Sequence, residues 1–244
     1  MKIKLRYLLI LITINLFVIG CSRNNIISEN SQNSIYKSSQ DKLKKYNYKG
    51  AIKLLEQLYN NYPLSLYKKK AQLDLIYAYY KSSELLLAIK TIDNFILSNP
   101  NDPNIDYVLY MRGLSAQKID KNALQDFFGI DYSDKDPQYA IAAFKSFNQI
   151  IHSYPNSVYI KDAAKRLILI KERLAKYQLS IIQYYNKRGA YIAIINRTEE
   201  MLKNFPESKY TRNALHYMKN AYDKLGLEDE KNKVVQLILN PFKK

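Results

Sequence analysis

Two groups of residues in this sequence are of types that can perform nucleophilic catalysis or bind a metal ion. The Ser-x-x-Lys pattern of penicillin-recognising enzymes occurs at residues 34–37, 39–42 and 65–68. Lysine is abundant in the chain, however, and the companion motifs of those enzymes are missing. The two histidines, His152 and His216, have no cysteine or glutamate at metal-ligand spacing. Neither group therefore indicates an active site.

The acidic segment from Asp131 to Asp136 resembles a calcium-binding loop only in part. An EF-hand loop needs oxygen ligands at its first, third and fifth positions and a glycine at its sixth. Lys135 stands at the fifth position and Asp136 at the sixth, and the sequence also has no glycine-rich phosphate loop. We therefore expect a protein that is not an enzyme and that binds no metal or cofactor.

The most informative residue is Cys21, the only cysteine of the chain. It follows a basic N-terminus and an apolar stretch, residues 7–19, that is too short to remain as a membrane span. The order Val18-Ile19-Gly20-Cys21 resembles a bacterial lipoprotein processing site. We expect residues 1–20 to be a cleaved signal peptide and Cys21 to carry a covalent lipid anchor of N-acyl and S-diacylglycerol groups. Ser22 permits transfer to the outer membrane in lipoproteins of this kind. The alternative is an ordinary export signal with an incidental cysteine.

The chain is strongly basic. Its net charge of +16 falls to +13 once the three basic residues of the signal segment are removed. Such a charge usually indicates nucleic acid or an anionic membrane as partner, and export argues against nucleic acid. The abundance of lysine, asparagine, isoleucine and tyrosine is typical of an AT-rich genome, which accounts for part of the charge. Attraction to anionic lipid or to acidic partner surfaces stays open.

Regularly placed prolines predict a repeat architecture. Apolar residues recur at three- and four-residue intervals from about Ser34 onwards, as in amphipathic helices. Four helical segments end at Pro63, Pro100, Pro155 and Pro206, and the residues twelve positions earlier are Ala51, Ala88, Ala143 and Ile194. Alanine lets the two helices of a hairpin pack closely, and proline ends the second helix, as in tetratricopeptide repeats. The sequence therefore predicts an all-α fold, an array of about five tetratricopeptide-like helical hairpins that forms a curved solenoid.

The spacing of these prolines divides the chain into segments. We expect a signal peptide at 1–20, the lipidated cysteine and a flexible tether at 21–33, N-terminal repeats at 34–118, an insertion with the third repeat at 119–157, and C-terminal repeats at 158–244. The last segment should begin with a long helix over about 158–185, have a turn at Gly189, and contain a weak fifth repeat that ends at Pro241. Asp102 and Asp136, each followed by proline, should cap helix starts.

The first helices of such an array line a concave groove. Counting from the alanines, and from Gly113 as the close-packing position of the third repeat, gives a candidate substrate-peptide groove of Tyr36, Gln40, Lys70, Leu73, Tyr77, Tyr80, Tyr107, Tyr110 and Gln117. Tyrosine offers apolar area and a hydroxyl, which suits an extended peptide. The alternative is that several of these tyrosines fill the core.

Seven segments carry a more specific resemblance. They are residues 72–80 (QLDLIYAYY), 99–107 (NPNDPNIDY), 110–114 (YMRGL), 124–129 (LQDFFG), 164–167 (AKRL), 173–177 (RLAKY) and 184–190 (YYNKRGA). These segments resemble the BamD family, the lipoproteins of the outer-membrane β-barrel assembly (BAM) complex. The similarity extends from the lipidation site to about residue 225.

That resemblance implies a lipoprotein on the periplasmic face of the outer membrane. The N-terminal repeats would receive targeting sequences of unfolded outer-membrane proteins, and the C-terminal repeats would dock on the POTRA domains of BamA. Other BAM lipoproteins are further implied partners. Arg188, Asn196 and Arg197 are the partner-docking residues that the resemblance indicates, and Lys70 or Arg112 is our candidate contact for the free carboxylate of a substrate. The alternatives are a periplasmic scaffold that recruits peptidoglycan enzymes and a secretin pilotin.

Overall fold

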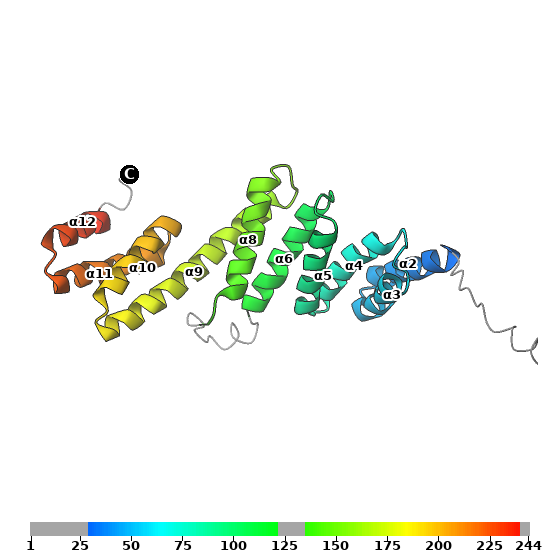
Figure 1. The fold of residues 1–244 in the computed structure, drawn as a ribbon, viewed down its shortest axis with the longest axis horizontal. Helices are drawn as coiled ribbons and strands as arrows, with labels where there is room; N and C mark the ends of the chain where they lie inside the picture. Colours follow the sequence, from blue (N-terminus) through cyan, green and yellow to red (C-terminus); the bar gives the residue numbers. More distant parts are fainter. Residues whose placement is uncertain (1–28, 122–134, 240–244) are drawn as a thin grey trace, which may run out of the picture.

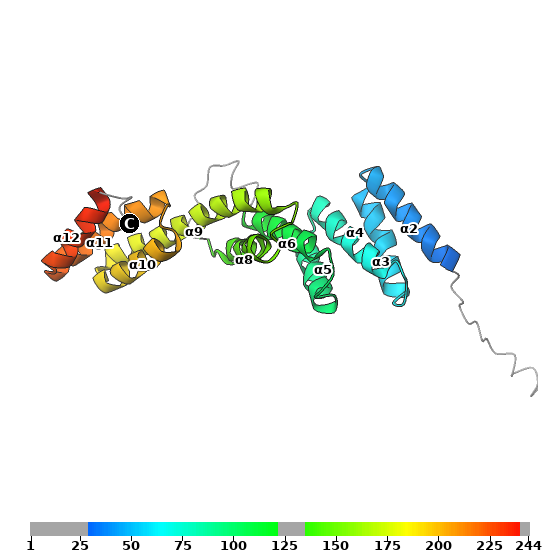
Figure 2. The same cartoon turned by 90° about the horizontal axis from the view of Figure 1, so that it is seen from above.

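The computed structural model describes residues 29–121 and 135–239, and these residues form ten α-helices and no strand. The helices are α2 (Glu29–Lys44), α3 (Tyr48–Asn61), α4 (Lys68–Lys81), α5 (Leu85–Ser98), α6 (Ile105–Asp120), α8 (Gln138–Ser153), α9 (Ile160–Arg188), α10 (Tyr191–Asn204), α11 (Lys209–Leu225) and α12 (Glu228–Leu239). Consecutive helices pack against each other as antiparallel hairpins, and the hairpins follow one another along the long axis of the molecule (Figures 1 and 2). The predicted all-α solenoid of tetratricopeptide-like hairpins is thus confirmed. None of the described helices combines the length and the apolar character that crossing a bilayer requires.

The positions that predicted the repeat are packing positions in the structure. Ala51, Ala88, Ala143 and Ile194 are completely buried on the second helices of their hairpins. Each of the four prolines directly follows the C-cap residue of such a helix, two positions after its last helical residue. Gly189 ends α9 in the left-handed conformation, with φ of 67°, which a residue with a Cβ rarely adopts.

The long helix α9 belongs to two hydrophobic cores. Its first half, through Ala163, Leu167, Ile170 and Leu174, packs into the core of α4 to α8. Its second half, which begins at Ala175, packs into the core that α10, α11 and α12 complete. A third cluster joins α3, α4 and α5 near the N-terminal end. Since one unbroken helix serves two adjacent cores, the two halves of the solenoid are tied together by backbone hydrogen bonds as well as by packing.

Some helix starts differ from the sequence expectation. Helix α2 begins at Glu29, five residues before the expected start at Ser34, so residues 29–33 are helix and not tether. Asp102 and Asp136 do not occupy the N-cap positions, which belong to Asn104 and Pro137. Each carboxylate instead accepts a hydrogen bond from the backbone N–H two residues later, at 2.9 and 3.0 Å. The predicted caps are therefore wrong by one or two residues, although the carboxylates still stabilise the turns.

Several expectations fall on residues outside the described ranges. These are the signal peptide at 1–20, the lipidation site at Cys21 with the tether up to residue 28, most of the insertion with its segment 124–129, and Pro241. The two ends of the insertion are described, and one arginine binds both. Arg173 of α9 pairs with Asp120 at the end of α6, with 3.3 Å between Nε and Oδ2, and donates from Nη2 to the carbonyl oxygen of Lys135 at 3.1 Å.

Gly113 of α6 packs closely against Phe147 of α8. A Cβ added to this residue would lie 2.5 Å from Cε1 and 2.6 Å from Cζ of Phe147, whose ring is completely buried. We predict that Gly113→Ala lowers the free energy of unfolding by about 1–3 kcal/mol, because a buried ring in a packed core has little room to move. The midpoint of urea unfolding measures this loss.

Gly50→Ala is the matched control, since Gly50 also lies within a helix and its added Cβ would meet only the side chain of Asn47. That side chain can rotate away at the cost of its cap hydrogen bond, while alanine gains about 1 kcal/mol of helix propensity. Equal unfolding midpoints for the two variants would contradict the close contact at Gly113.

Candidate functional site

In the N-terminal half, a tyrosine and a carboxylate come together from adjacent first helices. Tyr36 of α2 donates its hydroxyl to Oδ2 of Asp74 on α4 at 2.9 Å, and Gln40 Nε2 donates to the same oxygen at 2.7 Å. Burial raises the pKa of Asp74, although both hydrogen bonds and the nearby Lys70 favour the charged form. Burial and then the charge of Asp74 also raise the pKa of Tyr36. Asp74 thus connects the first two repeats and fixes the ring of Tyr36.

A second unit of the same design lies between α6 and α9. Tyr110 donates its hydroxyl to Oδ2 of Asp162 at 2.7 Å, and Arg166 Nε donates to that same oxygen. Arg166 Nη1 also donates to Gln117 Oε1 at 2.8 Å. The hydrogen bond from Tyr110, followed by that from Arg166, lowers the pKa of Asp162. The second donor to the carboxylate is thus the guanidinium of Arg166, whereas at Asp74 it is the side-chain amide of Gln40.

In both units an aromatic ring from the N-terminus of the following first helix stacks on the tyrosine. Tyr67, which precedes α4, lies 4.9 Å from Tyr36 between ring centroids, at an interplanar angle of 29°. Tyr159, which precedes α9, lies 4.5 Å from Tyr110 at 18°. Each unit is therefore a stacked tyrosine pair with one hydroxyl held by a carboxylate. We call them the Tyr36 unit (Tyr36, Tyr67, Asp74) and the Tyr110 unit (Tyr110, Tyr159, Asp162).

Two further tyrosines of the predicted groove, Tyr107 and Tyr77, make ring contacts of their own. The ring centroid of Tyr107 is 6.1 Å from that of Tyr159. Burial raises the pKa of Tyr107, with smaller contributions from Tyr159, Asp74 and Tyr77. Tyr77 is 37% exposed and meets the edge of Tyr48 at 6.0 Å. Tyrosines therefore lie along α2, α4, α6 and the start of α9, and we call this set the aromatic surface.

Of the remaining residues of the predicted groove, some are exposed and others pack against the core. Leu73 and Tyr80 are partly buried and pack against the central core, and the ammonium of Lys118 lies 5.3 Å from the centre of the Tyr80 ring. Lys70 is exposed on α4, one turn before Asp74. Arg112 faces the second helices, because its Nε donates to Asp93 of α5 at 2.9 Å and its Nη1 to Ser146 of α8 at 3.3 Å. Lys70 is therefore the better placed of the two proposed carboxylate contacts.

The sequence reasoning missed Tyr67 and Tyr159, although a signal for them was present. The pattern aromatic-Pro-x-Ser-x-Tyr occurs at residues 62–67, 154–159 and 205–210. In each copy the serine Oγ accepts a hydrogen bond from the backbone N–H of the tyrosine, at 3.1 to 3.2 Å. This turn fixes the backbone of the tyrosine at the start of the next helix.

In the C-terminal half, Arg197 is held in place by α9. Its Nη1 donates to Gln178 Oε1 at 2.8 Å, and its guanidinium lies 5.7 Å from the centre of the Tyr185 ring. Asn196, the preceding residue on α10, is exposed. Arg188 is exposed at the end of α9, with its guanidinium 5.0 Å from the Tyr184 ring. The three predicted docking residues thus lie on one helix pair, and Arg197 is the one held by a side-chain hydrogen bond to the other helix.

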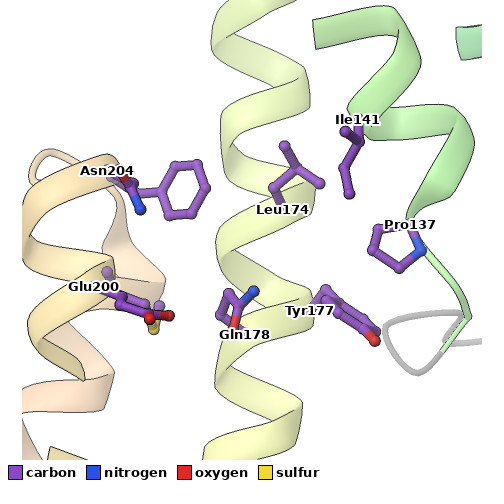
Figure 3. Close-up of a pocket in the computed structure, with 9 residues that line it drawn as sticks. Pro137, Ile141, Leu174, Tyr177, Gln178, Glu200 and Asn204 are labelled. Atoms are coloured by element: carbon purple, nitrogen blue, oxygen red, sulfur yellow. The ribbon is translucent and has the colours of Figure 1, made fainter. Parts of the chain in front are cut away.

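An apolar crevice opens between the start of α8, α9 and α10 (Figure 3). Its volume is about 150 Å³, and it is lined by Pro137, Ile141, Leu174, Tyr177, Gln178, Glu200, Met201, Asn204 and Phe205. Gln178, which accepts the hydrogen bond from Arg197, thus also lines the crevice. The arrangement offers a pocket for an apolar side chain next to a fixed cation. Among the described residues, no three histidine, aspartate, glutamate or cysteine side chains gather as they would to hold a metal ion.

Comparison with known proteins identifies the family. The family described as "YfiO: Outer membrane lipoprotein" matches residues 28–237. An outer membrane protein assembly factor BamD of Vibrio cholerae serotype O1 is 40% identical over 225 residues, which cover 91% of this chain and 93% of the relative. The protein of the same name from Buchnera aphidicola is 41% identical over 207 residues and 84% of each chain, and that of Haemophilus influenzae is 36% identical over 231 residues, 94% of this chain and 88% of the relative. The chain belongs to the BamD (YfiO) family of outer membrane lipoproteins.

Proposed function

We propose that this chain is a non-enzymatic lipoprotein subunit of the outer-membrane β-barrel assembly machinery. It is held on the periplasmic face of the outer membrane by the lipid on Cys21. Its aromatic surface binds targeting sequences of unfolded outer-membrane proteins, and its Arg197 side docks on the POTRA domains of BamA. Membership of the family supports this role, as do the relatives named outer membrane protein assembly factors.

The observation that carries the peptide-binding role is the repetition of the Tyr36 and Tyr110 units along the first helices. In each unit the tyrosine hydroxyl is engaged by the carboxylate, so the faces and edges of the rings are what a bound segment would meet. Rings whose orientation is already fixed lose little conformational entropy on binding. An extended segment with apolar side chains at alternate positions suits such a row of rings.

The docking role is supported by the pairing of Arg197 with the apolar crevice. Arginine beside a pocket is a common arrangement at the energetic centre of protein interfaces. Because Gln178 and Tyr185 hold the guanidinium, the charge is presented in one orientation, which suits a bidentate contact with a partner carboxylate.

We predict that Tyr110→Ala weakens binding of a peptide from the C-terminus of an outer-membrane β-barrel protein by about tenfold, because it removes one stacked ring of the surface. Tyr110→Phe keeps the ring and should lose less. Fluorescence anisotropy of the labelled peptide measures both variants. Tyr46→Ala is the control, since Tyr46 is 77% exposed in the turn after α2 and its ring meets that of Tyr48, which belongs to neither unit. Equal losses for Tyr110→Ala and Tyr46→Ala would refute a specific role of the surface.

A second prediction concerns the terminal carboxylate of such a peptide. Lys70→Gln should reduce binding of the free-acid peptide by about threefold to tenfold and leave the amidated peptide unchanged, because only the free acid can pair with the ammonium. Lys90→Gln, an exposed position on α5, controls for the general loss of positive charge. Equal affinity of the wild-type chain for the free-acid and the amidated peptide would show that Lys70 does not bind the terminal carboxylate.

The third prediction concerns the partner. Arg197→Glu should weaken binding to the periplasmic domains of BamA from the same organism by about tenfold or more, since charge reversal places like charges together and breaks the contact with Gln178. The matched control is Lys203→Glu, an equal change of charge at an exposed position of the same helix. Isothermal titration at two salt concentrations measures both variants, and circular dichroism checks the fold. Parallel weakening of the two variants would indicate attraction by overall charge and would remove Arg197 from the interface.

A further inference from the structure

Two leucines in the turn between α3 and α4 point into solvent. Leu64 is 97% exposed and Leu66 is 82% exposed, whereas Leu55 and Leu58 of the preceding helix are completely buried. Isolated exposed leucines are ordinary, but two such residues in one six-residue turn place an apolar tip on the surface. Large apolar side chains are also exposed at the ends of two other hairpins. Leu97, in the last turn of α5, is 81% exposed, and Val158, between α8 and α9, is 84% exposed. The tip has no partner side chain of its own to cover it among the described residues.

Three lysines follow the tip directly. Lys69 Nζ pairs with Oδ2 of Asp102 at 2.7 Å, which ties this turn to the next one, between α5 and α6. The ammonium of Lys68 lies 5.4 Å from the centre of the Tyr59 ring, and Lys70 is exposed. Large apolar side chains beside a cluster of lysines suit the interface of an anionic bilayer, where the leucines enter the acyl boundary and the ammonium groups meet phosphates.

The tip also lies on the edge from which the N-terminal segment leaves. Helices α2 and α4 are first helices of adjacent hairpins, so α2 begins at the edge where α3 ends and α4 starts, as Figure 2 shows. Eight residues, 21–28, join Cys21 to the start of α2. Even fully extended, they span at most about 28 Å. A lipid on Cys21 would therefore keep this edge close to the bilayer.

We propose that Leu64 and Leu66, together with Lys68 to Lys70, form a membrane-contact patch that binds the surface of an anionic phospholipid bilayer. The patch would orient the N-terminal hairpins relative to the membrane, which a single flexible lipid anchor does not do. The argument that the patch lies beside the membrane rests on the lipid anchor of the proposed function. The binding of the patch to a bilayer is independent of that anchor, because it can be tested on a chain that lacks it.

The first test is vesicle co-sedimentation of the chain from Ser22 onwards, which contains every described helix. We expect binding to phosphatidylglycerol–phosphatidylethanolamine vesicles and weak binding to phosphatidylcholine vesicles. The double variant Leu64→Asp, Leu66→Asp should bind the anionic vesicles at least about tenfold more weakly. The control is Ile168→Asp, Leu169→Asp, the same change at two adjacent exposed residues of α9, which are 64% and 57% exposed. Equal loss in both double variants would overturn the patch.

A second readout separates insertion from attraction by charge alone. The sequence contains no tryptophan, so Leu66→Trp introduces a single fluorophore. Its emission should shift to the blue on addition of anionic vesicles and should be quenched by brominated lipid, while Ile168→Trp should change little. A vesicle-bound chain with an unshifted Leu66→Trp emission would show that the basic surface binds without the leucines, and absence of vesicle binding would assign the tip to a protein partner. Either result overturns this proposal. The proposed function is tested separately, because peptide and BamA binding are measured without lipid.

Discussion

The continuity of α9 is the constraint on which the relation between the two halves of the molecule depends. The helix carries Asp162 of the Tyr110 unit near its start, and Gln178, the partner of Arg197, in its second half. Sixteen residues separate them, or about 24 Å along a helix that rises 1.5 Å per residue. Because each half of α9 is buried in a different core, bending it would require opening one of them. The aromatic surface and the Arg197 crevice are therefore held at a fixed separation.

Within the N-terminal half, carboxylates determine the order of the aromatic surface. A tyrosine ring on a helix surface can adopt several rotamers, but a hydroxyl bonded to a carboxylate on the next first helix selects one. The stacked ring from the following turn removes further freedom. Both interactions cross between repeats, so they also contribute to the stacking of the hairpins. The same contacts therefore serve the stability of the array and the shape of its surface.

Much of this fold was predictable, because packing leaves a regular mark on the sequence. Ala51, Ala88 and Ala143 must be small where two helices meet, and the prolines must follow helix ends, so their spacing gave the hairpins directly. The insertion interrupts this spacing in the third repeat, where Gly113 had to be chosen as the close-packing position, and its contact with Phe147 agrees with that choice. The start of α2 was missed because its polar first turn has no apolar periodicity. The pairing of Tyr36 with Asp74 could not be predicted, because it joins residues 38 positions apart whose geometry depends on how the hairpins stack.

Arg173, which binds both ends of the insertion, bears on how the length of the insertion can change. Asp120 and the carbonyl group of Lys135 are fixed by Arg173, a residue of α9 that lies outside the insertion itself. The end of α6 and the residue three before α8 are therefore both held from outside the insertion. Since the entropic cost of closing a loop grows only slowly with its length, the segment between these two ends can gain or lose residues at small cost. The insertion is thus a place where new sequence can be acquired while Arg173 keeps its two ends in register with the repeats.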